Sequence, residues 1–522
     1  MNFAYYGIIN AKKYPDKEYL IERTPSKDLR RVLTWKEFNE ESNKVANYLQ
    51  RELGVKKGDF VMHLQMNSLE WIVTFYAILK TGAVAIPLNY RFASADIKYV
   101  YDSFTPKVLI VGDGFMPKVQ PIQKEMPDIK SYICIGPDAP ADMIPYGEVI
   151  KNGDAEDLLV DVDGDDPAEL MFTSGTTGPP KPVCQAHETL YQIGIGIALT
   201  YDMGHNTVYL APNPFYHSGS FFLAFPSYLA GGKKIVQLEL TKPHYLLDAI
   251  VEEKVNDGWI TVPHMSDTVN AIKRGHIDIS KYDFSHVTGS IVIGAQPVPY
   301  SLYEDMKKIF PFRTGNIYGI TEGGGGGSVN LYDEDVLERP GSIGKPTFNV
   351  EARAVDENGK DVPTGEVGEL ILRSPRNMKE YFNNPEMTAE AIKDGWLYTG
   401  DLVRIDEDGF VYIADRKKDL IIRGGENIFP VEIENALRSH PKVADAAVIG
   451  YPHERLVEIA MAIIQLYPEE TMTQEEVIQF CADKGLAKFK WPEKVVFEDV
   501  IRNVTGKIDK PKMRKKYVPE NA

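Results

Sequence analysis

Hydrophobic residues in the first two thirds of the chain follow two alternating patterns. Residues 69–79 carry apolar side chains at helical spacing, and Asn67 or Ser68 precedes them as a start signal. The short apolar runs 84–86 and 108–111 have the length and composition of buried strands. Because helical and strand-like segments alternate, the pattern favours an α/β fold with mostly parallel sheets.

The pattern changes after about residue 340. Residues 350–355 and 369–373 read as strands around the turn sequence Glu357–Gly359, which is typical of hairpins. A compact α+β stretch follows residue 418 and is long enough to form a small domain. We therefore predict a large region of several subdomains at 1–417, with mostly parallel sheets and a small β-rich part, and a small C-terminal domain at 418–522.

Composition sets wide limits on function. A chain of 522 residues is too long for one ordinary core, and 43% hydrophobic with 11% aromatic residues is typical of a globular protein. The 58 basic and 75 acidic residues give a net charge of −17, which argues against nucleic acid as the main partner. Six basic residues lie within 505–516. Taken alone they predict a solvated basic tail; the alternative is that their positive charge attracts anionic ligands.

Cysteine usage and hydropathy indicate a cytoplasmic protein. Cys134, Cys184 and Cys481 lie far apart, so neither a disulfide framework nor a zinc site is expected. The first residues lack the pattern of a signal peptide, and the apolar stretch 71–88 is interrupted at 80–82. We expect no membrane span.

The segment 171–181, with the sequence MFTSGTTGPPK, places small hydroxyl residues and glycines directly after an apolar strand. Backbone N–H groups of such a loop can converge on phosphate oxygens, and Lys181 adds positive charge. The segment is not a Walker A loop, because Pro182 follows the lysine and the glycine spacing differs. A plain flexible turn is the alternative interpretation.

Four further segments support the interpretation of 171–181 as a phosphate-binding loop: Ile317–Glu322, Trp396–Asp401, Asp415–Asn427 and Thr505–Lys507. Together with 171–181 they resemble, in order and spacing, the motifs of the adenylate-forming superfamily, which includes acyl-CoA synthetases, firefly luciferase and peptide-synthetase adenylation domains. The resemblance covers essentially the whole chain. It implies an enzyme that activates a carboxylic acid with ATP as an acyl-adenylate.

The resemblance also implies which residues bind ATP. Tyr318 offers an aromatic face to adenine, Asp401 suits the ribose hydroxyls, and the guanidinium fork of Arg416 reaches ribose or phosphate. The full set of ATP- and AMP-binding candidates is Thr173, Ser174, Gly175, Thr176, Thr177, Gly178, Lys181, Gly294, Ala295, Gln296, Tyr318, Gly319, Thr321, Asp401 and Arg416.

Lys507, Glu322 and Thr177 are the predicted catalytic residues. Attack of the carboxylate on the α-phosphate develops negative charge, which the Lys507 ammonium stabilises. Glu322 supplies a hard oxygen ligand for the Mg²⁺ that bridges ATP phosphates. Gly506 lets the loop before Lys507 bend close to the nucleotide.

The mixed anhydride with AMP makes the acyl group reactive toward a thiol, and the resemblance implies coenzyme A as the acceptor. It further implies that the C-terminal domain swivels about a hinge at Lys418 between the two steps. Gly424, Gly425 and Lys488 are the predicted CoA-binding residues, with Gly425 allowing close approach of the pantetheine arm. Lys488 belongs to the segment Leu486–Pro492, which is similar to a lysine-bearing stretch of acyl-CoA ligases.

His217, Gly219 and Gly323 are the predicted residues of the acid pocket. The segment Phe215–Gly219 contains no acidic residue to meet an amino group, which disfavours amino acids. The glycine run 323–327 is longer than the family pattern and indicates either a wider pocket or a mobile loop. His217 is read as a wall residue or a gate. We predict a medium-chain, aromatic or alicyclic acid as substrate.

Two departures from the family pattern and two other functions stay open. Pro182 stands where a glycine is common, and Ile508–Lys510 differs from the frequent ending, which leaves the contacts of the last helix unspecified. The alternatives to a CoA ligase are an adenylating enzyme that loads a carrier-protein pantetheine or oxidises its adenylate as luciferase does, and a non-catalytic nucleotide-binding regulator. The predicted partners are a carboxylic acid, ATP and CoA; self-association into a homo-oligomer is left open.

Overall fold

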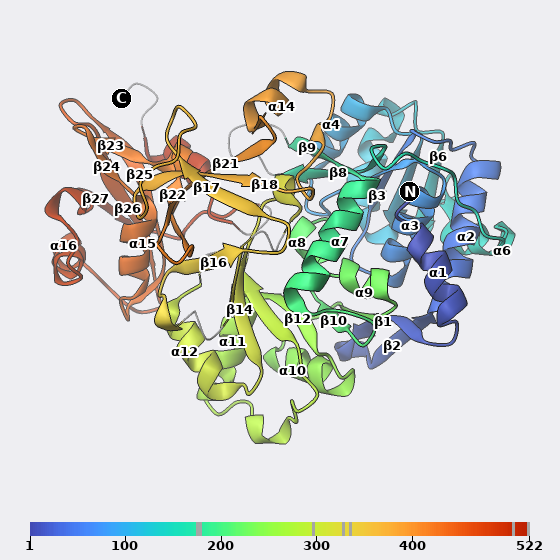
Figure 1. Cartoon of the computed structure of the whole chain (residues 1–522), viewed down its shortest axis with the longest axis horizontal. Helices are drawn as coiled ribbons and strands as arrows, with labels where there is room; N and C mark the ends of the chain where they lie inside the picture. Colours follow the sequence, from blue (N-terminus) through green and yellow to red (C-terminus); the bar gives the residue numbers. More distant parts are fainter. Residues whose placement is uncertain (174–179, 295–297, 326–328, 333–336, 504–506, 519–522) are drawn as a thin grey trace. The chain divides into compact units, whose positions relative to one another are not determined.

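The computed structural model describes residues 1–518 with the exception of 174–179, 295–297, 326–328, 333–336 and 504–506 (Figure 1). The chain packs into two compact units. Unit 1 comprises Met1–Thr173, Pro180–Glu351 and Leu372–Leu397, and unit 2 comprises Ser174–Pro179, Ala352–Ile371 and Tyr398–Ala522. The predicted boundary between residues 417 and 418 falls inside unit 2 and stays a prediction.

The first sheet of unit 1 has eight strands in the order β19-β9-β8-β4-β3-β5-β6-β7. Its parallel strands are β3 (Phe60–Leu64), β4 (Val84–Pro87), β5 (Val108–Gly112), β6 (Ser131–Ile135), β7 (Ile144–Pro145) and β8 (Pro167–Thr173). The antiparallel strands β9 (Lys181–Ala186) and β19 (Glu380–Tyr381) extend one edge. Helices α3 (Leu69–Lys80), α4 (Ser94–Phe104), α5 (Met116–Val119) and α6 (Tyr146–Asn152) lie between these strands in sequence. Both predicted strands, 84–86 and 108–111, are confirmed.

A second set of strands in unit 1 runs in the order β16-β15-β14-β13-β12-β10-β11-β1-β2. Its parallel members are β1 (Glu18–Thr24), β10 (Val208–Ala211), β11 (Lys233–Gln237), β12 (Asp257–Thr261), β13 (Ser290–Gly294) and β14 (Arg313–Tyr318). The antiparallel members are β2 (Leu29–Thr34), β15 (Val329–Tyr332) and β16 (Ser342–Pro346). The prediction of an α/β fold with mostly parallel sheets is therefore confirmed for unit 1 (Figure 1).

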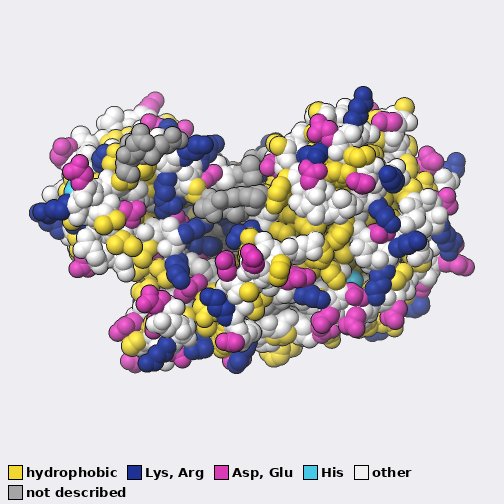
Figure 2. Space-filling view, turned by 90° about the horizontal axis from the view of Figure 1, so that it is seen from above, with side chains coloured by type: hydrophobic (Ala, Val, Ile, Leu, Met, Phe, Trp, Pro, Cys, Tyr) yellow, Lys and Arg dark blue, Asp and Glu magenta, His cyan; other side chains and the backbone are white. Residues whose placement is uncertain are grey.

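The remaining helices of unit 1 lie before, between and after these strands. They are α1 (Tyr5–Lys13), α2 (Trp35–Arg51), α7 (His187–Tyr201), α8 (Ser218–Phe222), α9 (Phe225–Ala230), α10 (Pro243–Glu252), α11 (Val262–Lys273), α12 (Tyr300–Ile309) and α14 (Pro385–Ala391), with the short strand β20 (Ile392–Lys393) after α14. In the space-filling view, acidic and basic side chains are interspersed over the visible surface of this unit (Figure 2).

Helix α3 is formed as the sequence predicts and lies in the core of unit 1. The Ser68 side chain accepts a hydrogen bond from Trp71 N at 3.0 Å, which caps the helix, and Gly82 follows its end with a positive φ of 72°. All its residues except Glu70 are buried, and its apolar side chains share one core cluster with residues from both sets of strands. A helix that is apolar all round is stabilised by burial on every side.

Lys234 lies buried in this core beside two aromatic rings. Its side chain on β11 is fully buried, Nζ has no hydrogen-bond partner among the described residues, and it lies 4.8 Å from the ring centroid of Phe221 and 5.3 Å from that of Phe215. Burial lowers the pKa of Lys234 from its ordinary value of 10.5 to about 7. The lysine therefore reduces the stability of the fold at neutral pH.

We expect Lys234→Met to stabilise the protein by about 1–4 kcal/mol at pH 7, because an apolar side chain of similar length removes the cost of burying the amine. Between pH 7 and 10.5 the unfolded chain binds the Lys234 proton more tightly than the folded chain, so wild-type stability rises with pH in this window. The gain from the substitution is accordingly expected to shrink as the pH rises from 7 toward 10. Urea unfolding at several pH values measures it.

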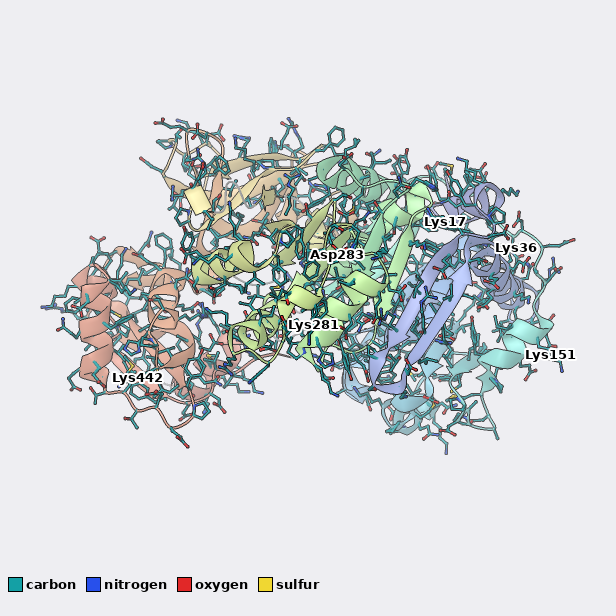
Figure 3. All side chains as sticks on the ribbon, turned by 90° about the horizontal axis from the view of Figure 1, so that it is seen from below. Lys17, Lys36, Lys151, Lys281, Asp283 and Lys442 are labelled. Atoms are coloured by element: carbon teal, nitrogen blue, oxygen red, sulfur yellow. The ribbon has the colours of Figure 1, made fainter. Side chains whose placement is uncertain are left out.

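Lys151→Met is the matched control, since Lys151 is exposed on α6 and lies at the surface (Figure 3). It should change the free energy of unfolding little at any of these pH values. A Lys234→Met protein that is less stable than wild type at pH 7 would contradict the account of this core.

Unit 2 contains two groups of strands. The first has the order β17-β18-β21-β22 and consists of β17 (Glu351–Val355), β18 (Val367–Arg373), β21 (Trp396–Ile405) and β22 (Val411–Arg416), of which residues 351, 372–373 and 396–397 belong to unit 1. The second is a five-stranded sheet of β23 (Ile421–Arg423), β24 (Glu426–Ile428), β25 (Val443–His453), β26 (Val457–Leu466) and β27 (Lys494–Phe497). Helices α15 (Pro430–Arg438), α16 (Gln474–Asp483) and α17 (Lys510–Tyr517) complete the unit, so the predicted α+β character of the C-terminal part is confirmed.

The basic C-terminal run is more than a solvated tail. In α17, Lys510 pairs with Glu434 at 2.8 Å, Arg514 pairs with Asp419 at 2.9 Å, and Lys516 pairs with Glu498. Lys510 is buried, so its ion pair fixes α17 within unit 2. Among the helices that the structure describes, none combines the length and the apolar character that a membrane crossing requires.

Candidate functional site

The predicted phosphate loop connects two paired strands of unit 1. Thr173 ends β8, Lys181 begins β9, and the two residues are direct partners in the antiparallel register. The loop therefore leaves and re-enters the sheet at adjacent positions. Five of its predicted residues lie outside the described part of the chain: Ser174, Gly175, Thr176, Thr177 and Gly178.

Two of the predicted ATP-binding residues, Gly294 and Tyr318, lie at the carboxyl ends of two neighbouring parallel strands. Gly294 ends β13 and is the register partner of Ile317 in β14, which ends one residue later at Tyr318. A Cβ atom at Gly294 would come within 2.7 Å of Ile317 O, so only glycine fits there. Tyr318 is half-buried and Gly319 is exposed, while Ala295 and Gln296 fall outside the described ranges.

A short 3-10 turn, η5 (Thr321–Gly323), carries Glu322 and is held from several sides. Gln185 in β9 donates to Thr321 O at 3.0 Å, and the hydroxyls of Ser218 and Thr321 lie 3.1 Å apart. The backbone of Glu322 is fixed as well, because Met378 N donates to Glu322 O at 2.6 Å. The turn that carries Glu322 is thus held by β9, by α8 and by the segment before β19.

Tyr381 touches the Glu322 side chain itself. Its hydroxyl donates to Glu322 Oε1 at 2.8 Å, and Lys181 Nζ lies 5.3 Å from the centroid of its ring. Burial and the neighbouring Glu322 carboxylate raise the pKa of Tyr381 well above its ordinary value, so the hydroxyl keeps its proton. Tyr381 is not among the residues predicted from the sequence, because only the long-range pairing of β19 with β9 brings it to this place.

The predicted acid-pocket residues lie on α8 and in the glycine run. His217 is the residue before α8, and a Cβ at Gly219 would make an ordinary contact of 3.6 Å with Trp259. Gly323 is buried in η5. Gly324 and Gly325 follow with φ values of 82° and 78°, and Cβ atoms there would come within 2.8 Å of Arg376 O and of the Phe222 ring, respectively. Glycine is required at these two positions by conformation and close packing.

The predicted ribose residues face each other in unit 2. Asp401 in β21 and Arg416 in β22 are register partners, and Arg416 Nε lies 2.5 Å from Asp401 Oδ1. The Asp401 side chain is buried and the Arg416 side chain is exposed. Next to them, Glu369 accepts from Gly400 N at 3.2 Å and pairs with Lys417 at 2.8 Å. This network holds a carboxylate and a guanidinium in one fixed arrangement.

The predicted hinge residue, Lys418, lies in a short turn between β22 and β23. It is exposed within the 3-10 turn Lys417–Asp419, and Asp419 beside it is buried and pairs with Arg514. On the other side, Asp415 accepts from Val431 N at 2.9 Å at the start of α15, and burial raises the pKa of Asp415 to about 6. The turn is therefore anchored on both sides of Lys418.

Gly424 and Gly425 form the two-residue connection of the β23–β24 hairpin. Arg423 and Glu426 are register partners, and both glycines have positive φ, 58° and 93°, as a type I′ turn requires. Gly424 N donates to Leu456 O at 2.7 Å, which ties the turn to the start of β26. Gly425 has open space around the position of a Cβ.

The two predicted lysines of the C-terminal part are both exposed. Lys488 begins a 3-10 turn, Lys488–Lys490. Lys507 follows the residues 504–506, which are not described, and its backbone is fixed by Asn503: Asn503 N donates to Lys507 O at 2.8 Å, and Lys507 N donates to Asn503 Oδ1 at 3.1 Å. The structure thus places Lys507 next to the antiparallel bridge between Arg502 and Ile508.

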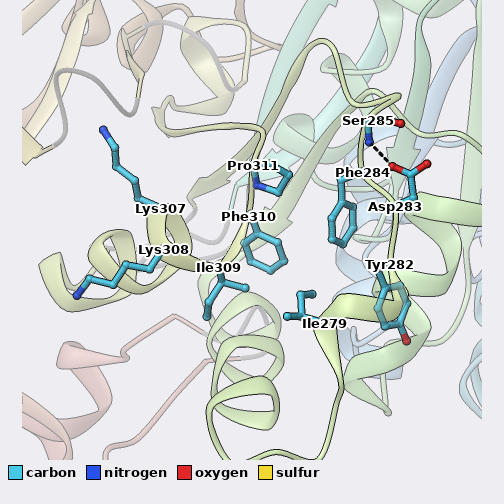
Figure 4. A pocket seen from close by; sticks show the side chains of 10 residues that line it. All are labelled: Ile279, Tyr282, Asp283, Phe284, Ser285, Lys307, Lys308, Ile309, Phe310 and Pro311. Atoms are coloured by element: carbon cyan, nitrogen blue, oxygen red, sulfur yellow. Dashed lines mark hydrogen bonds between the residues drawn. The ribbon is translucent and has the colours of Figure 1, made fainter.

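A separate hollow of about 580 Å³ lies at the opposite, amino ends of β13 and β14 (Figure 4). Tyr282, Phe284 and Phe310 form its aromatic wall, and Lys307 and Lys308 lie at the end of α12 beside it. No predicted site residue lines it. The hollow is therefore distinct from the carboxyl-end edge that carries Gly294 and Tyr318.

Two protein-family models match this chain. Residues 9–382 match the model of the AMP-binding enzyme family, and residues 432–507 match that of the AMP-binding enzyme C-terminal domain. The chain belongs to the AMP-binding enzyme family. The resemblance to adenylate-forming enzymes that the motifs indicate is thereby confirmed.

Relatives of this AMP-binding enzyme are ligases. A long-chain-fatty-acid–CoA ligase of Mycobacterium tuberculosis is 34% identical over 500 residues, which cover 94% of each chain. A fatty acid–[acyl-carrier-protein] ligase of Streptomyces coeruleorubidus is 30% identical over 502 residues, covering 94% of this chain and 93% of the relative. Among solved structures, the anthranilate CoA ligase AuaEII in complex with anthranoyl-AMP matches with a TM-score of 0.88 and 26% identity, covering 99% of this chain and 97% of the other.

Proposed function

We propose that this AMP-binding enzyme is an AMP-forming acid–CoA ligase. In the first step a carboxylate attacks the α-phosphate of ATP, giving acyl-AMP and pyrophosphate. In the second step the CoA thiol attacks the acyl carbon, giving acyl-CoA and AMP. The family match across most of the chain carries this proposal, together with the retention of an acidic, a basic and a ribose-type group at the motif positions.

We propose that the phosphate loop with Lys181 binds the ATP phosphates, that Gly294 and Tyr318 receive the adenine ring, and that Glu322 holds Mg²⁺. The Glu322 carboxylate is suited to bind Mg²⁺ because it is half-buried and offers hard oxygen donors. Tyr381 donates a hydrogen bond to one of its oxygens, Oε1, and Oε2 is the second oxygen of the same carboxylate. Mg²⁺ bound there would neutralise charge on the phosphates. Thr177 is proposed to assist at the same loop.

In unit 2, we propose that Asp401 and Arg416 bind the ribose and that Lys507 stabilises the charge that develops in the first step. Asp401 keeps a fixed orientation because Arg416 pairs with it, and a buried carboxylate in a fixed position suits two ribose hydroxyls. Lys507 carries its ammonium at an exposed position, where a lysine can reach a bound nucleotide.

For the second step, we propose that rotation about Lys418 presents the Gly424–Gly425 turn to the adenylate. The open space at Gly425 suits the narrow pantetheine arm, and Lys488 is proposed to meet an anionic part of CoA. We further propose that the enzyme works in the cytoplasm, as the chain's cysteine usage indicates.

The proposed acid is a medium-chain, aromatic or alicyclic carboxylic acid that lies along His217, Gly219 and Gly323. The relatives named above are ligases of a long-chain fatty acid and of anthranilate, an aromatic acid. Both aliphatic and aromatic acids are therefore included in the proposal. The carrier-protein ligase among the relatives supports a second candidate, transfer of the acyl group to a carrier-protein pantetheine.

A panel of carboxylic acids tests the proposal. Acid-dependent exchange of pyrophosphate into ATP should appear with at least one acid of the proposed range, and AMP release should rise when CoA is added. AMP release that responds to an acylable carrier protein and not to CoA would favour the second candidate. Absence of acid-dependent exchange across the panel would contradict both.

A further inference from the structure

The short strand β19 places one tyrosine between two groups of opposite charge in unit 1. Tyr381 is the register partner of Val183 in β9, and Lys181 lies two residues before Val183 on the same strand. Because side chains alternate between the faces of a strand, Lys181, Val183 and Tyr381 project to one face. Glu322 reaches the same place from η5.

The contacts of Tyr381 use its two chemical parts separately. The hydroxyl donates to Glu322 Oε1 at 2.8 Å, whereas the ring faces Lys181, whose Nζ lies 5.3 Å from the ring centroid. Within the described part of the chain, the ion pairs closer than 4.0 Å do not include one between Lys181 and Glu322. Tyr381 thus contacts an ammonium with its ring and one oxygen of a carboxylate with its hydroxyl.

The geometry points to Tyr381 as a positioning residue for the first half-reaction. It orients the Glu322 carboxylate toward metal-bound ATP and prevents Lys181 from neutralising that carboxylate directly. This inference rests on the proposed function of Glu322 and Lys181. Neither the sequence motifs nor the family comparison assigns a role to Tyr381.

The physical reason lies in how a carboxylate and an ammonium behave when they meet. A direct pair would occupy both groups with each other, so each would have to be released before it could bind metal or phosphate. With the Tyr381 ring, Lys181 keeps a favourable cation–π contact that leaves its N–H donors available. The tyrosine hydroxyl donates a hydrogen bond to Oε1 of Glu322 and so orients the carboxylate. The second oxygen, Oε2, then has a defined direction for metal binding.

The surroundings of Tyr381 make it rigid enough for this role. Its side chain is buried in a small cluster with Val183, Met378 and Leu397. Its backbone is held as well, because Tyr381 N donates a hydrogen bond to Thr388 Oγ1 at 3.0 Å. A ring held on both sides can transmit a defined position to the carboxylate that it contacts.

Tyr381→Phe is the decisive variant, because it keeps the ring over Lys181 and removes only the hydroxyl. We expect the dissociation constant for Mn²⁺–ATP, followed by electron paramagnetic resonance of Mn²⁺, to rise about tenfold, as loss of a hydrogen bond to a charged group predicts. Pyrophosphate exchange should need a correspondingly higher Mg²⁺ concentration. Thioester formation from supplied acyl-adenylate should stay near wild type, since that step involves no polyphosphate.

Tyr303→Phe is the matched control. Tyr303 is a buried tyrosine of α12 whose hydroxyl has no hydrogen-bond partner among the described residues, so its loss should leave Mn²⁺–ATP affinity unchanged. Tyr381→Leu, which removes the ring as well, should weaken Mn²⁺–ATP binding further than Tyr381→Phe does. Thermal unfolding of each variant shows whether the fold is kept.

Wild-type affinity for Mn²⁺–ATP in Tyr381→Phe would overturn the inference. An equal loss in both half-reactions together with a lowered thermal midpoint would also overturn it, since that pattern marks a purely structural residue. If the unmodified protein showed no acid-dependent pyrophosphate exchange, the proposed function would fail instead, and the comparison of Mn²⁺–ATP affinities would still decide whether Tyr381 acts on Glu322.

Discussion

Replacing Lys507 by alanine is expected to lower the rate of adenylate formation by about a hundredfold to a thousandfold, the cost of removing one group that stabilises developing charge. The proposed role of Lys507 is confined to the first step, so thioester formation from supplied acyl-AMP should be largely retained. Pyrophosphate exchange and single-turnover thioester formation measure the two half-reactions separately.

Lys512→Ala is a suitable control for Lys507→Ala, since Lys512 is an exposed lysine of the same basic run. It should leave both half-reactions near wild type. An equal loss in both half-reactions of Lys507→Ala would contradict the assignment, because it would place the lysine in binding or in the fold rather than in the first chemical step.

Lys418→Pro is expected to leave pyrophosphate exchange largely intact and to lower overall acyl-CoA turnover by about a hundredfold, the scale of a misplaced reacting group. Proline fixes φ at residue 418 and restricts Lys417 before it, so the turn can no longer rotate. The hydrogen bond from Val431 N to Asp415 spans this turn, so it has to open if the segments before and after Lys418 rotate.

Lys418→Ala separates the hinge from the charge. It removes the ammonium without fixing φ, so overall turnover should stay within a few-fold of wild type. Normal turnover in Lys418→Pro would rule out a hinge at this residue. Loss of pyrophosphate exchange in the proline variant, with a lowered thermal midpoint, would mean that the turn is needed for the fold of unit 2.

Local signals in the sequence were sufficient for the elements that local physics determines. Helix α3 begins at its predicted cap because the Ser68 hydroxyl satisfies Trp71 N, and the parallel strands after it are short apolar runs that can only be buried. The Gly424–Gly425 pair adopts the tight hairpin turn that two positive φ angles require. These features depend on a few neighbouring residues and are therefore legible in one sequence.

Contacts between distant segments could not be predicted in this way. Tyr381 meets Glu322 only because β19 adds to the edge of β9, and Gln185 reaches Thr321 across 136 residues of sequence. The unpaired Lys234 is equally invisible, since a lysine in a strand reads as exposed until its neighbours are known. The resemblance to a family supplied the motif residues, whereas the residues that hold them in place became apparent only from packing.

The most direct test of the central claim follows the oxygen atoms of the acid. When both carboxylate oxygens of the acid are labelled with ¹⁸O, one of them becomes the bridging oxygen of the adenylate and leaves with AMP. Mass spectrometry of AMP after turnover with ATP and CoA should therefore show one ¹⁸O atom in each AMP formed. Unlabelled AMP, or label in inorganic phosphate with ADP as the other product, would contradict activation through an acyl-adenylate.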